Sequence, residues 1–295
     1  MNYTEYEGRF FVSPLIGCKG QCIYCYLDSE GIARGDIRKN TLKIKTLLNG
    51  IVKNPNYLGG KKGTIISIGA HCDIFPLYEK ELIDFSIEWI SEILKIGNPV
   101  QIISKNAISG GVIKRLINNI EYKNQLLYST TITTFNYSSI IEKNTSSPFE
   151  RLKVLEHFKR YGVPTNVMIK PFIPGITNKE KNIFISQMRD AADYCVVGEF
   201  YLPNIQVLNS LERLVGTDIN LNNCRNAILD CSGSNKYKSI FSKQMEGFVE
   251  FLTKNGMRVF KKSSCVNSNI LKVNNPGGYY KKGVYCVNCG NCSGE

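Results

Sequence analysis

Residues 9–25 read RFFVSPLIGCKGQCIYC, and this stretch decides the fold. The run Arg9–Leu15 is short and rich in Phe and Val, which predicts a β-strand. Three cysteines follow it in a loop, Cys18, Cys22 and Cys25, with the spacing C-x3-C-x2-C. In βα folds, the loops that follow the strands carry the chemistry. The stretch therefore predicts a cysteine site at the carboxyl end of the first strand of a βα array.

The spacing of these cysteines favours an iron-sulfur cluster. Three thiolates so close in sequence can bind three corners of a 4Fe-4S cubane and leave the fourth iron open to an outside ligand. A zinc site, which usually takes four ligands from paired C-x2-C motifs, and an accidental group of cysteines are the alternatives. The position of the motif directly after the first strand favours the cluster.

The chain from residue 9 to about residue 200 alternates short β-branched runs with longer stretches of helical period, the pattern of repeated βα units. The predicted strands are Arg9–Leu15, Thr64–Gly69, Val100–Ser104, Leu126–Thr133, Pro164–Lys170 and Tyr194–Phe200. The predicted helices are Ile37–Val52, Tyr78–Ile96, Ser109–Asn119, Pro148–Tyr161 and Asn178–Ala191. Six units are too few to close an eight-stranded barrel, so we expect an α/β fold, an open partial (β/α)6 barrel.

The pattern changes after residue 200, and we expect three parts: a barrel over 1–200, a helical linker and extension over 201–262, and a cysteine-rich segment over 263–295. The second part contains two predicted helices, Ile205–Leu214 and Ile240–Asn255, a polar stretch, Gly216–Lys238, and a short strand, Arg258–Lys261. The cysteine-rich tail is expected to begin at Cys265.

The composition is that of a globular protein, with 43% hydrophobic and 21% charged residues. We find no apolar run long enough to cross a bilayer and no signal-peptide pattern at the start, so we expect a cytoplasmic protein without a membrane partner. Eleven cysteines in such a protein favour metal binding over disulfides. The formal charge of +12 fits an acidic or polyanionic partner, and equally a lysine-rich solvated surface.

The cysteine loop resembles that of the radical S-adenosylmethionine (SAM) superfamily, and the run Cys22-Ile-Tyr-Cys25-Tyr-Leu resembles its spore photoproduct lyase group. The resemblance implies a partial barrel of radical SAM type, a 4Fe-4S cluster on the three cysteines, and SAM as the ligand of the open iron. It also implies that Tyr24 packs beside the adenine of SAM and that Tyr26 relays a radical. Simple packing of both tyrosines over the cluster is the alternative.

Further SAM contacts follow from the same resemblance. The second strand ends in a Gly69-Ala70 turn, where a missing side chain would let the backbone approach the methionyl amine. Lys105, after the third strand, would meet the SAM carboxylate as a compact positive charge. Thr131 on the fourth strand would contact the ribose, and Lys170 after the fifth would line the adenine side. Without this resemblance, a lysine at the end of a strand would be interpreted as a solvated side chain.

Cys72 lies in the loop where the group's lyases carry a cysteine that donates a hydrogen atom to the product radical. Here Cys72 directly precedes Asp73, whereas the group's cysteine stands a few residues earlier relative to its aspartate. Cys72 is therefore a candidate catalytic residue, with a buried structural thiol as the alternative.

A second group of cysteines lies near the end of the chain. Cys286, Cys289 and Cys292 form C-x2-C-x2-C, which matches the opening of a ferredoxin run, and Cys265 upstream would be a fourth ligand. We expect a second, auxiliary cluster on these four residues, and a zinc knuckle is the alternative. The group's lyases are not known for such a tail, whereas radical SAM maturases of ribosomally made peptides carry auxiliary clusters near their C-termini.

These patterns predict an enzyme that reductively cleaves SAM to a 5′-deoxyadenosyl radical and abstracts hydrogen from a substrate, with flavodoxin or ferredoxin as the electron donor. The added tail favours a peptide substrate, as in peptide maturation. The lyase-like loop and the basic charge favour the alternative of DNA repair or nucleic-acid modification. A non-catalytic iron-sulfur or zinc protein is the third possibility.

Overall fold

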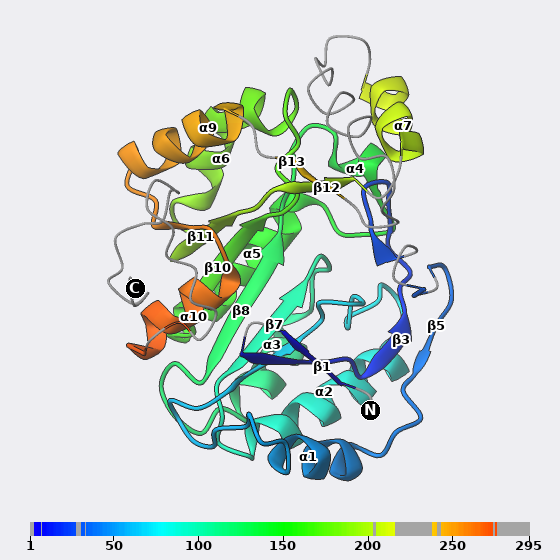
Figure 1. Cartoon of the computed structure of the whole chain (residues 1–295), viewed down its shortest axis with the longest axis vertical. Coiled ribbons are helices and arrows are strands. Elements are labelled where there is room, and N and C mark those ends of the chain that lie inside the picture. The colour runs from blue at the N-terminus through cyan, green and yellow to red at the C-terminus, as the bar shows by residue number, and fades with distance from the viewer. Residues whose placement is uncertain are drawn as a thin grey trace.

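The structure is a computed structural model that describes residues 3–6, 8–27, 31–32, 34–202, 205–215, 238–240, 243–273 and 275. At its centre is one eight-stranded sheet in the order β1-β2-β6-β7-β8-β10-β11-β14 (Figure 1). Its strands are β1 (Tyr3–Tyr6), β2 (Arg9–Val12), β6 (Ile65–Ile68), β7 (Val100–Ser104), β8 (Leu126–Thr131), β10 (Thr165–Ile169), β11 (Tyr194–Val197) and β14 (Val259–Phe260). β1 is antiparallel to β2, and all other neighbours are parallel.

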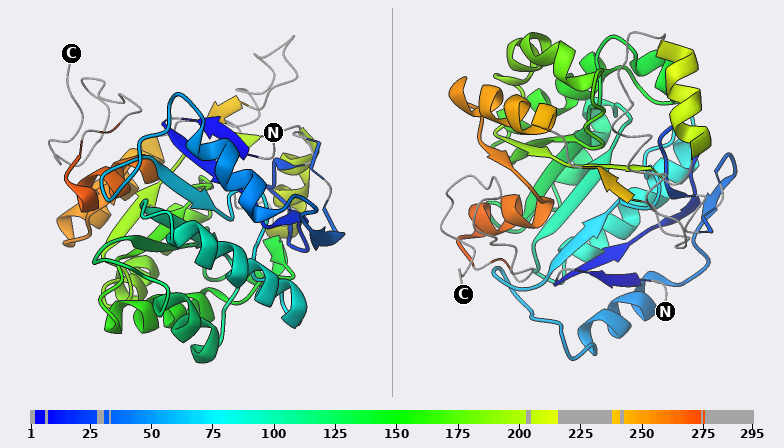
Figure 2. Two further views of the ribbon diagram at one scale, coloured as in Figure 1. Left: turned by 90° about the horizontal axis from the view of Figure 1, so that it is seen from below. Right: turned by 45° about the horizontal axis from the view of Figure 1, so that its top comes forward.

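The connections between the parallel strands carry helices that pack on the outer face of the curved sheet (Figure 2). They are α1 (Ile44–Val52), α2 (Lys80–Leu94), α3 (Gly110–Ile117), α5 (Pro148–Arg160), α6 (Lys181–Met188) and α9 (Lys243–Lys254), with the 3-10 helix η2 (Thr177–Glu180) directly before α6. Two other helices, α4 (Ser138–Ile141) and α7 (Ile205–Val215), instead contribute apolar side chains to a cluster with Cys22 and Tyr24. The last helix, α10 (Ser263–Leu271), follows β14. The described residues also form three two-stranded sheets: β3 (Leu15–Gly17) with β5 (Ile37–Lys39), β4 (Gln21–Cys22) with β9 (Glu142–Lys143), and β12 (Phe200–Leu202) with β13 (Lys238–Ile240).

Both faces of the sheet are covered, which explains why its strands are apolar at successive positions. Leu126 and Tyr128 of β8 and Val167 of β10 belong to the core under the outer helices. Leu127 lies between the first two of these, and Met168 directly follows the third. Both point to the other face of the sheet, where they pack with α10. α10 therefore fills part of the inside of the barrel.

A buried polar chain also ties α10 to the inner face. Gln101 of β7 donates to Ser129 of β8 (3.0 Å), and Asn166 of β10 donates to the same hydroxyl (3.2 Å). Asn267 of α10 completes the chain by donating to Gln101 Oε1 (3.0 Å). All four side chains are buried, so these hydrogen bonds offset the cost of placing polar groups in the barrel interior.

The six predicted barrel strands are confirmed, and the predicted strand near 258–261 appears as β14, which adds a seventh parallel strand beside β11. The prediction of one helix over Ile37–Val52 is wrong in its first part, where Ile37–Lys39 forms β5 and the helix begins at Ile44. The Asn40 side chain accepts from Leu42 N (3.0 Å) and donates to Ser13 O (2.9 Å). The Asn40 side chain thus forms a local turn at the place where the prediction expected helical backbone hydrogen bonds.

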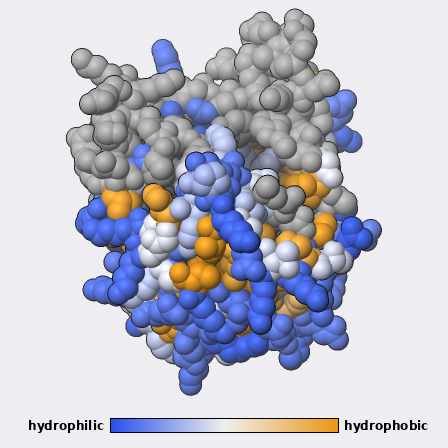
Figure 3. All heavy atoms as spheres, turned by 60° about the horizontal axis from the view of Figure 1, so that its bottom comes forward, coloured by the Kyte–Doolittle hydropathy of each residue, from blue (hydrophilic) through white to orange (hydrophobic). Residues whose placement is uncertain are grey.

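Figure 3 shows a face of the molecule on which hydrophobic side chains are exposed in separate patches among hydrophilic ones. Within the part of the chain that the structure describes, no helix combines the length and the apolar character needed to cross a membrane.

Candidate active site

A cavity of about 690 Å³ lies at the carboxyl ends of the parallel strands. Cys18, Cys22 and Cys25 line it together with residues at the ends of four strands: Gly69 and Ala70 after β6, Lys105 after β7, Thr131 at the end of β8 and Lys170 after β10. Its volume falls in the range of about 300–1,000 Å³ that is usual for small-molecule and cofactor sites. A depression of about 870 Å³ between the start of α1 and α2 lies apart from the cysteines.

The cysteine loop is fixed by backbone contacts on two sides. The β4–β9 pair places Cys22 opposite Glu142, and Ile23 N donates to Ile141 O (2.9 Å). On the other side, Arg34 Nη1 donates to Cys22 O (3.0 Å), and Gly35 N donates to Cys18 O (2.8 Å). These backbone contacts hold the loop in place. Its three cysteines have free thiols and form no disulfide.

The sulfur atoms of Cys18 and Cys22 converge over Gly20. A Cβ added to Gly20 would lie 3.4 Å from Cys18 Sγ and 4.0 Å from Cys22 Sγ, so glycine leaves the space between the two sulfurs open. The backbone N–H groups of Asp73 and Gly20 act to lower the pKa of the nearby Cys18 thiol. Burial raises the pKa of Cys18, and it raises the pKa of Cys22 to about 12.

Three cysteine thiols around one cavity are the type of ligand that a 4Fe-4S cluster uses. Over the described ranges, no group of three or more His, Cys, Asp or Glu side chains is arranged to hold one ion. A zinc ion needs its thiolates at about 2.3 Å from one centre. A cubane instead binds each thiolate at a different iron, and three cysteines around one cavity wall meet that requirement. The chemistry and placement of the donor set therefore fit a 4Fe-4S cluster.

Tyr24 is buried beside the cysteines, and Tyr26 lines the cavity. The Tyr24 hydroxyl donates to Glu142 Oε1 and accepts from Thr133 Oγ1 (3.4 Å). The Lys105 ammonium lies 5.7 Å from the centre of the Tyr24 ring. Burial, followed by the nearby carboxylate of Glu142, raises the pKa of Tyr24 well above its ordinary value.

Asp73 joins the loop after β6 to the end of β7. Its carboxylate accepts from Lys105 N (2.7 Å), from the Ser104 hydroxyl (2.8 Å) and from Phe75 N (3.1 Å). Burial of this carboxylate raises its pKa, and the three donors oppose the shift. For Lys105, burial alone would lower the pKa, but the interactions with Cys22 and Glu142 outweigh burial and raise the pKa.

Cys72 lies in the cavity wall with 4% of its surface exposed. Its thiol donates to Leu15 O (3.4 Å), and burial raises its pKa to about 12. The structure therefore brings Cys72 to the same cavity as the three cysteines of the loop, as a buried protonated thiol.

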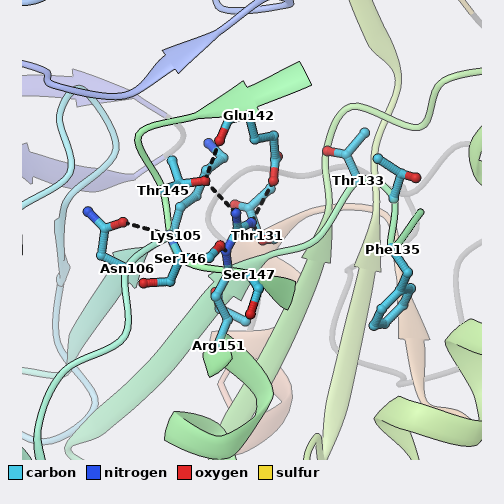
Figure 4. Close-up of polar contacts among 12 residues, drawn as sticks. Lys105, Asn106, Thr131, Thr133, Phe135, Glu142, Thr145, Ser146, Ser147 and Arg151 are labelled. Atoms are coloured by element: carbon cyan, nitrogen blue, oxygen red, sulfur yellow. Dashed lines mark hydrogen bonds and ion pairs between the residues drawn. The ribbon is translucent and has the colours of Figure 1, made fainter. Parts of the chain in front are cut away.

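The structure brings together Cys18, Cys22, Cys25, Tyr24, Tyr26, Gly69, Ala70, Cys72, Lys105, Thr131 and Lys170, all in the wall of one cavity. Sequence reasoning missed Glu142 and Arg151, which form a fully buried ion pair behind this wall (2.7 Å). Arg151 also donates to Thr131 O (2.7 Å), Ser146 O (2.8 Å) and Thr145 Oγ1 (2.6 Å), as Figure 4 shows. The only local signal was the Ser147-Pro148 start of α5, which places Arg151 in its first turn.

Of the second cysteine group, the structure describes only Cys265. It lies in α10 with 1% of its surface exposed, packed with Leu127 and Val196 inside the barrel, and Asn275 Nδ2 lies 3.2 Å from its sulfur. Cys286, Cys289 and Cys292 lie outside the described residues, so the auxiliary site stays a prediction.

No protein-family model matches the chain, and no curated protein sequence matches it either. Solved structures do match: a mutant spore photoproduct lyase with bound SAM and dinucleoside spore photoproduct has a TM-score of 0.59 and 14% identity, over 86% of this chain and 76% of that one. SuiB of Streptococcus suis bound to SAM has a TM-score of 0.54 and 12% identity, over 88% of this chain and 51% of SuiB. SuiB bound to its precursor peptide SuiA gives 0.54 and 11%, over 89% and 50%. The chain thus spans about half the length of SuiB, and at these identities what is shared is the fold: an α/β partial barrel with a mostly parallel sheet, the fold of the radical SAM enzymes.

Proposed function

We propose that this protein is a radical SAM enzyme, in which Cys18, Cys22 and Cys25 hold a 4Fe-4S cluster and SAM binds beside it. The observation that carries the proposal is that the three cysteines of the C-x3-C-x2-C loop share one cavity with residues at the ends of four parallel strands. When bound, the cluster supplies the electron that divides SAM into methionine and a 5′-deoxyadenosyl radical, which takes a hydrogen atom from the substrate. The electron itself would come from a protein such as flavodoxin or ferredoxin.

The cavity wall offers a matching contact for each part of SAM. Lys105, which carries a positive charge beside the cysteines, would bind the carboxylate. The Gly69-Ala70 turn, in which Gly69 has φ +92°, would bring backbone groups to the amine. Thr131 would contact the ribose, and Tyr24 and Lys170 would flank the adenine. These residues orient the cofactor and keep water from the reacting atoms.

Cys72 is the proposed hydrogen donor to the product radical, and Tyr26 is the proposed relay residue. Both line the cavity, and the Cys72 thiol keeps its proton in this buried position. Donation of the Cys72 hydrogen atom to a substrate radical would leave a thiyl radical on its sulfur. Transfer of a hydrogen atom from the Tyr26 hydroxyl would then restore the thiol and leave a tyrosyl radical.

For the substrate we propose a peptide. The cavity of about 690 Å³ has the size of a small-molecule site, so most of a macromolecular substrate would lie outside it. Support comes from SuiB, a similar fold solved with a precursor peptide, and from the expected C-terminal auxiliary cluster.

A nucleic-acid substrate is the second candidate, because the spore photoproduct lyase structure with the same fold holds a dinucleoside lesion. The formal charge of +12 also suits a phosphate backbone. Fluorescence anisotropy with random 20-mer DNA and RNA at increasing salt separates the two. The peptide proposal predicts no binding at about physiological salt. Tight, salt-dependent binding that also accelerates 5′-deoxyadenosine release would overturn it.

The proposed chemistry is tested by anaerobic reconstitution with iron and sulfide, followed by dithionite and SAM. We expect 5′-deoxyadenosine, and loss of both this product and the loop cluster in Cys22→Ala. Cys195→Ala is the matched control, because Cys195 is buried in β11 away from the cavity and should not affect either. A protein that binds iron but releases no nucleoside would be a passive iron-sulfur protein, and the proposal would fail.

Iron analysis also tests the auxiliary site. Two clusters correspond to about eight irons per chain and one to about four. We propose that Cys286→Ala and Cys265→Ala each lower the iron content toward about four while the loop cluster remains. An unchanged iron content in Cys265→Ala would restrict Cys265 to packing inside the barrel.

A further inference from the structure

Behind the cysteine loop lies a fully buried ion pair that the proposed contacts with SAM leave unexplained. Arg151 and Glu142 both have 0% of their side chains exposed, and Arg151 Nη1 lies 2.7 Å from Glu142 Oε2. The other carboxylate oxygen of Glu142 accepts from the Tyr24 hydroxyl. The ion pair therefore reaches the cysteine loop through one tyrosine.

The pair is held rigidly from the barrel side. Other N–H groups of Arg151 donate to the backbone oxygens of Thr131 and Ser146 and to the hydroxyl of Thr145, and that hydroxyl donates to Glu142 O (2.6 Å). Figure 4 shows these contacts converging between the end of β8 and the start of α5. Neither charge can turn away without breaking several buried hydrogen bonds.

The same segment also grips the cysteine loop through its backbone. Glu142 is opposite Cys22 in the β4–β9 pair, and Thr145 Cγ2 would lie 3.7 Å from a Cβ on Gly20. The segment from Glu142 to Thr145 thus contacts Gly20, Cys22 and Tyr24 of the cysteine loop. The position of this connection is set by Arg151.

Stability alone does not explain a charged pair at this place. A buried ion pair is often no more stabilising than apolar side chains of the same size, because both charges lose their hydration. Here the pair lies next to a proposed cluster, whose reduction potential depends on nearby charge and on the hydrogen bonding around it. A neutral pair places a fixed dipole there, while Lys105 supplies the net positive charge on the cavity side.

We propose that Glu142 and Arg151 are positioning residues that hold Tyr24 and the cysteine loop at the cavity and balance the charge beside the cluster. The inference rests on the proposed function, since it assumes the cluster and SAM cleavage. Glu142 acts through Tyr24 and the loop, and it does not itself line the cavity.

The test is redox titration of the cluster in anaerobically reconstituted variants. Glu142→Gln keeps the shape but leaves the charge of Arg151 uncompensated, so the reduction potential should become more positive. In the double variant Glu142→Gln with Arg151→Met, the positive charge is gone too, and the potential should return toward the wild-type value. Tyr24→Phe should leave the reduction potential nearly unchanged. It should slow 5′-deoxyadenosine formation about 10-fold, because the ring loses its hydrogen bond to Glu142.

Glu180→Gln is the matched control, because Glu180 is equally buried and hydrogen-bonded but contacts Thr134 and Phe135 away from the cysteines. In Glu180→Gln, the reduction potential of the cluster should equal that of the wild-type protein. The inference is overturned if Glu142→Gln behaves like Glu180→Gln while the wild-type protein holds its cluster and cleaves SAM. If the wild type itself holds no cluster, the proposed function fails and this inference fails with it.

Discussion

Gly198 lies directly against the side chain of Lys170, and a Cβ added to Gly198 would lie 2.1 Å from Lys170 Cε and 2.6 Å from its Cγ. Two hydrogen bonds fix the backbone at Gly198: its N–H donates to Ile169 O (3.1 Å), and its carbonyl accepts from Phe172 N (2.9 Å). The absence of a side chain at Gly198 thus gives Lys170 its path along the cavity wall.

If the proposed SAM site is correct, Gly198→Ala should displace Lys170 and weaken SAM binding about 10-fold, or roughly 1.4 kcal/mol. The dissociation constant of SAM for the reconstituted protein, measured by equilibrium dialysis, checks this. Gly247→Ala is the control, because a Cβ there meets nothing within 4 Å and alanine favours the helix. Unchanged SAM affinity in a folded Gly198→Ala protein would contradict the expected displacement.

Gly69→Ala should destabilise the whole protein. Gly69 has φ +92°, and an added Cβ would lie 2.1 Å from the backbone oxygen of Ile103 in the neighbouring strand. Gly97→Ala has the same backbone strain (φ +78°) but no neighbour within 4 Å. Thermal and urea unfolding should show a loss of about 1–2 kcal/mol for Gly97→Ala and a clearly larger loss for Gly69→Ala. Equal losses would mean that the contact with Ile103 relaxes freely.

Glu180 should be a strong stability residue even though it does not line the cavity. Its buried carboxylate accepts from Thr134 Oγ1 (2.6 Å), Phe135 N (2.6 Å) and Asn136 N (3.3 Å), which fixes the loop after β8. Glu180→Ala leaves three donors without this acceptor, and we expect a loss of about 3 kcal/mol in urea unfolding. Glu180→Gln keeps one acceptor oxygen and should cost less. A loss below about 1 kcal/mol for Glu180→Ala would show that water replaces the carboxylate.

The start of α5 should contribute a small, pH-dependent stability. Ser147 and Glu150 form a capping box, and hydrogen bonds from Ser147 lower the pKa of Glu150. A lowered pKa means that the stabilisation is present above the unfolded value of about 4.3 and is lost as the pH falls through the folded value. Ser147→Ala should cost about 1 kcal/mol at pH 7.

This difference between the wild type and Ser147→Ala should narrow below about pH 4, as Glu150 takes up a proton. Urea unfolding at several pH values measures it. A difference that stays constant down to pH 3 would assign the stabilisation to the Ser147 hydroxyl alone.

The sequence by itself determined the features that depend on neighbours along the chain. The β-branched runs and helical periods predicted the six barrel strands and a helix that begins at Pro148, where α5 starts, because local propensity acts within a few residues. The spacing of Cys18, Cys22 and Cys25 indicated a shared site for the same reason. The tertiary fold then brings Lys105 and Thr131, to which the family resemblance pointed, into the same cavity as that loop.

Contacts between distant segments were decided by the tertiary structure. Tyr24 and Glu142 are 118 residues apart, and Gln101 and Asn267 are 166 apart. Nothing local marks either pair, since a carboxylate or an amide in a polar stretch usually faces water. The packing of Cys265 among apolar side chains inside the barrel is likewise set by the fold and is not apparent from its spacing. Such pairings arise when strands and helices far apart in the chain pack together, and their partners carry no signal in the residues around them.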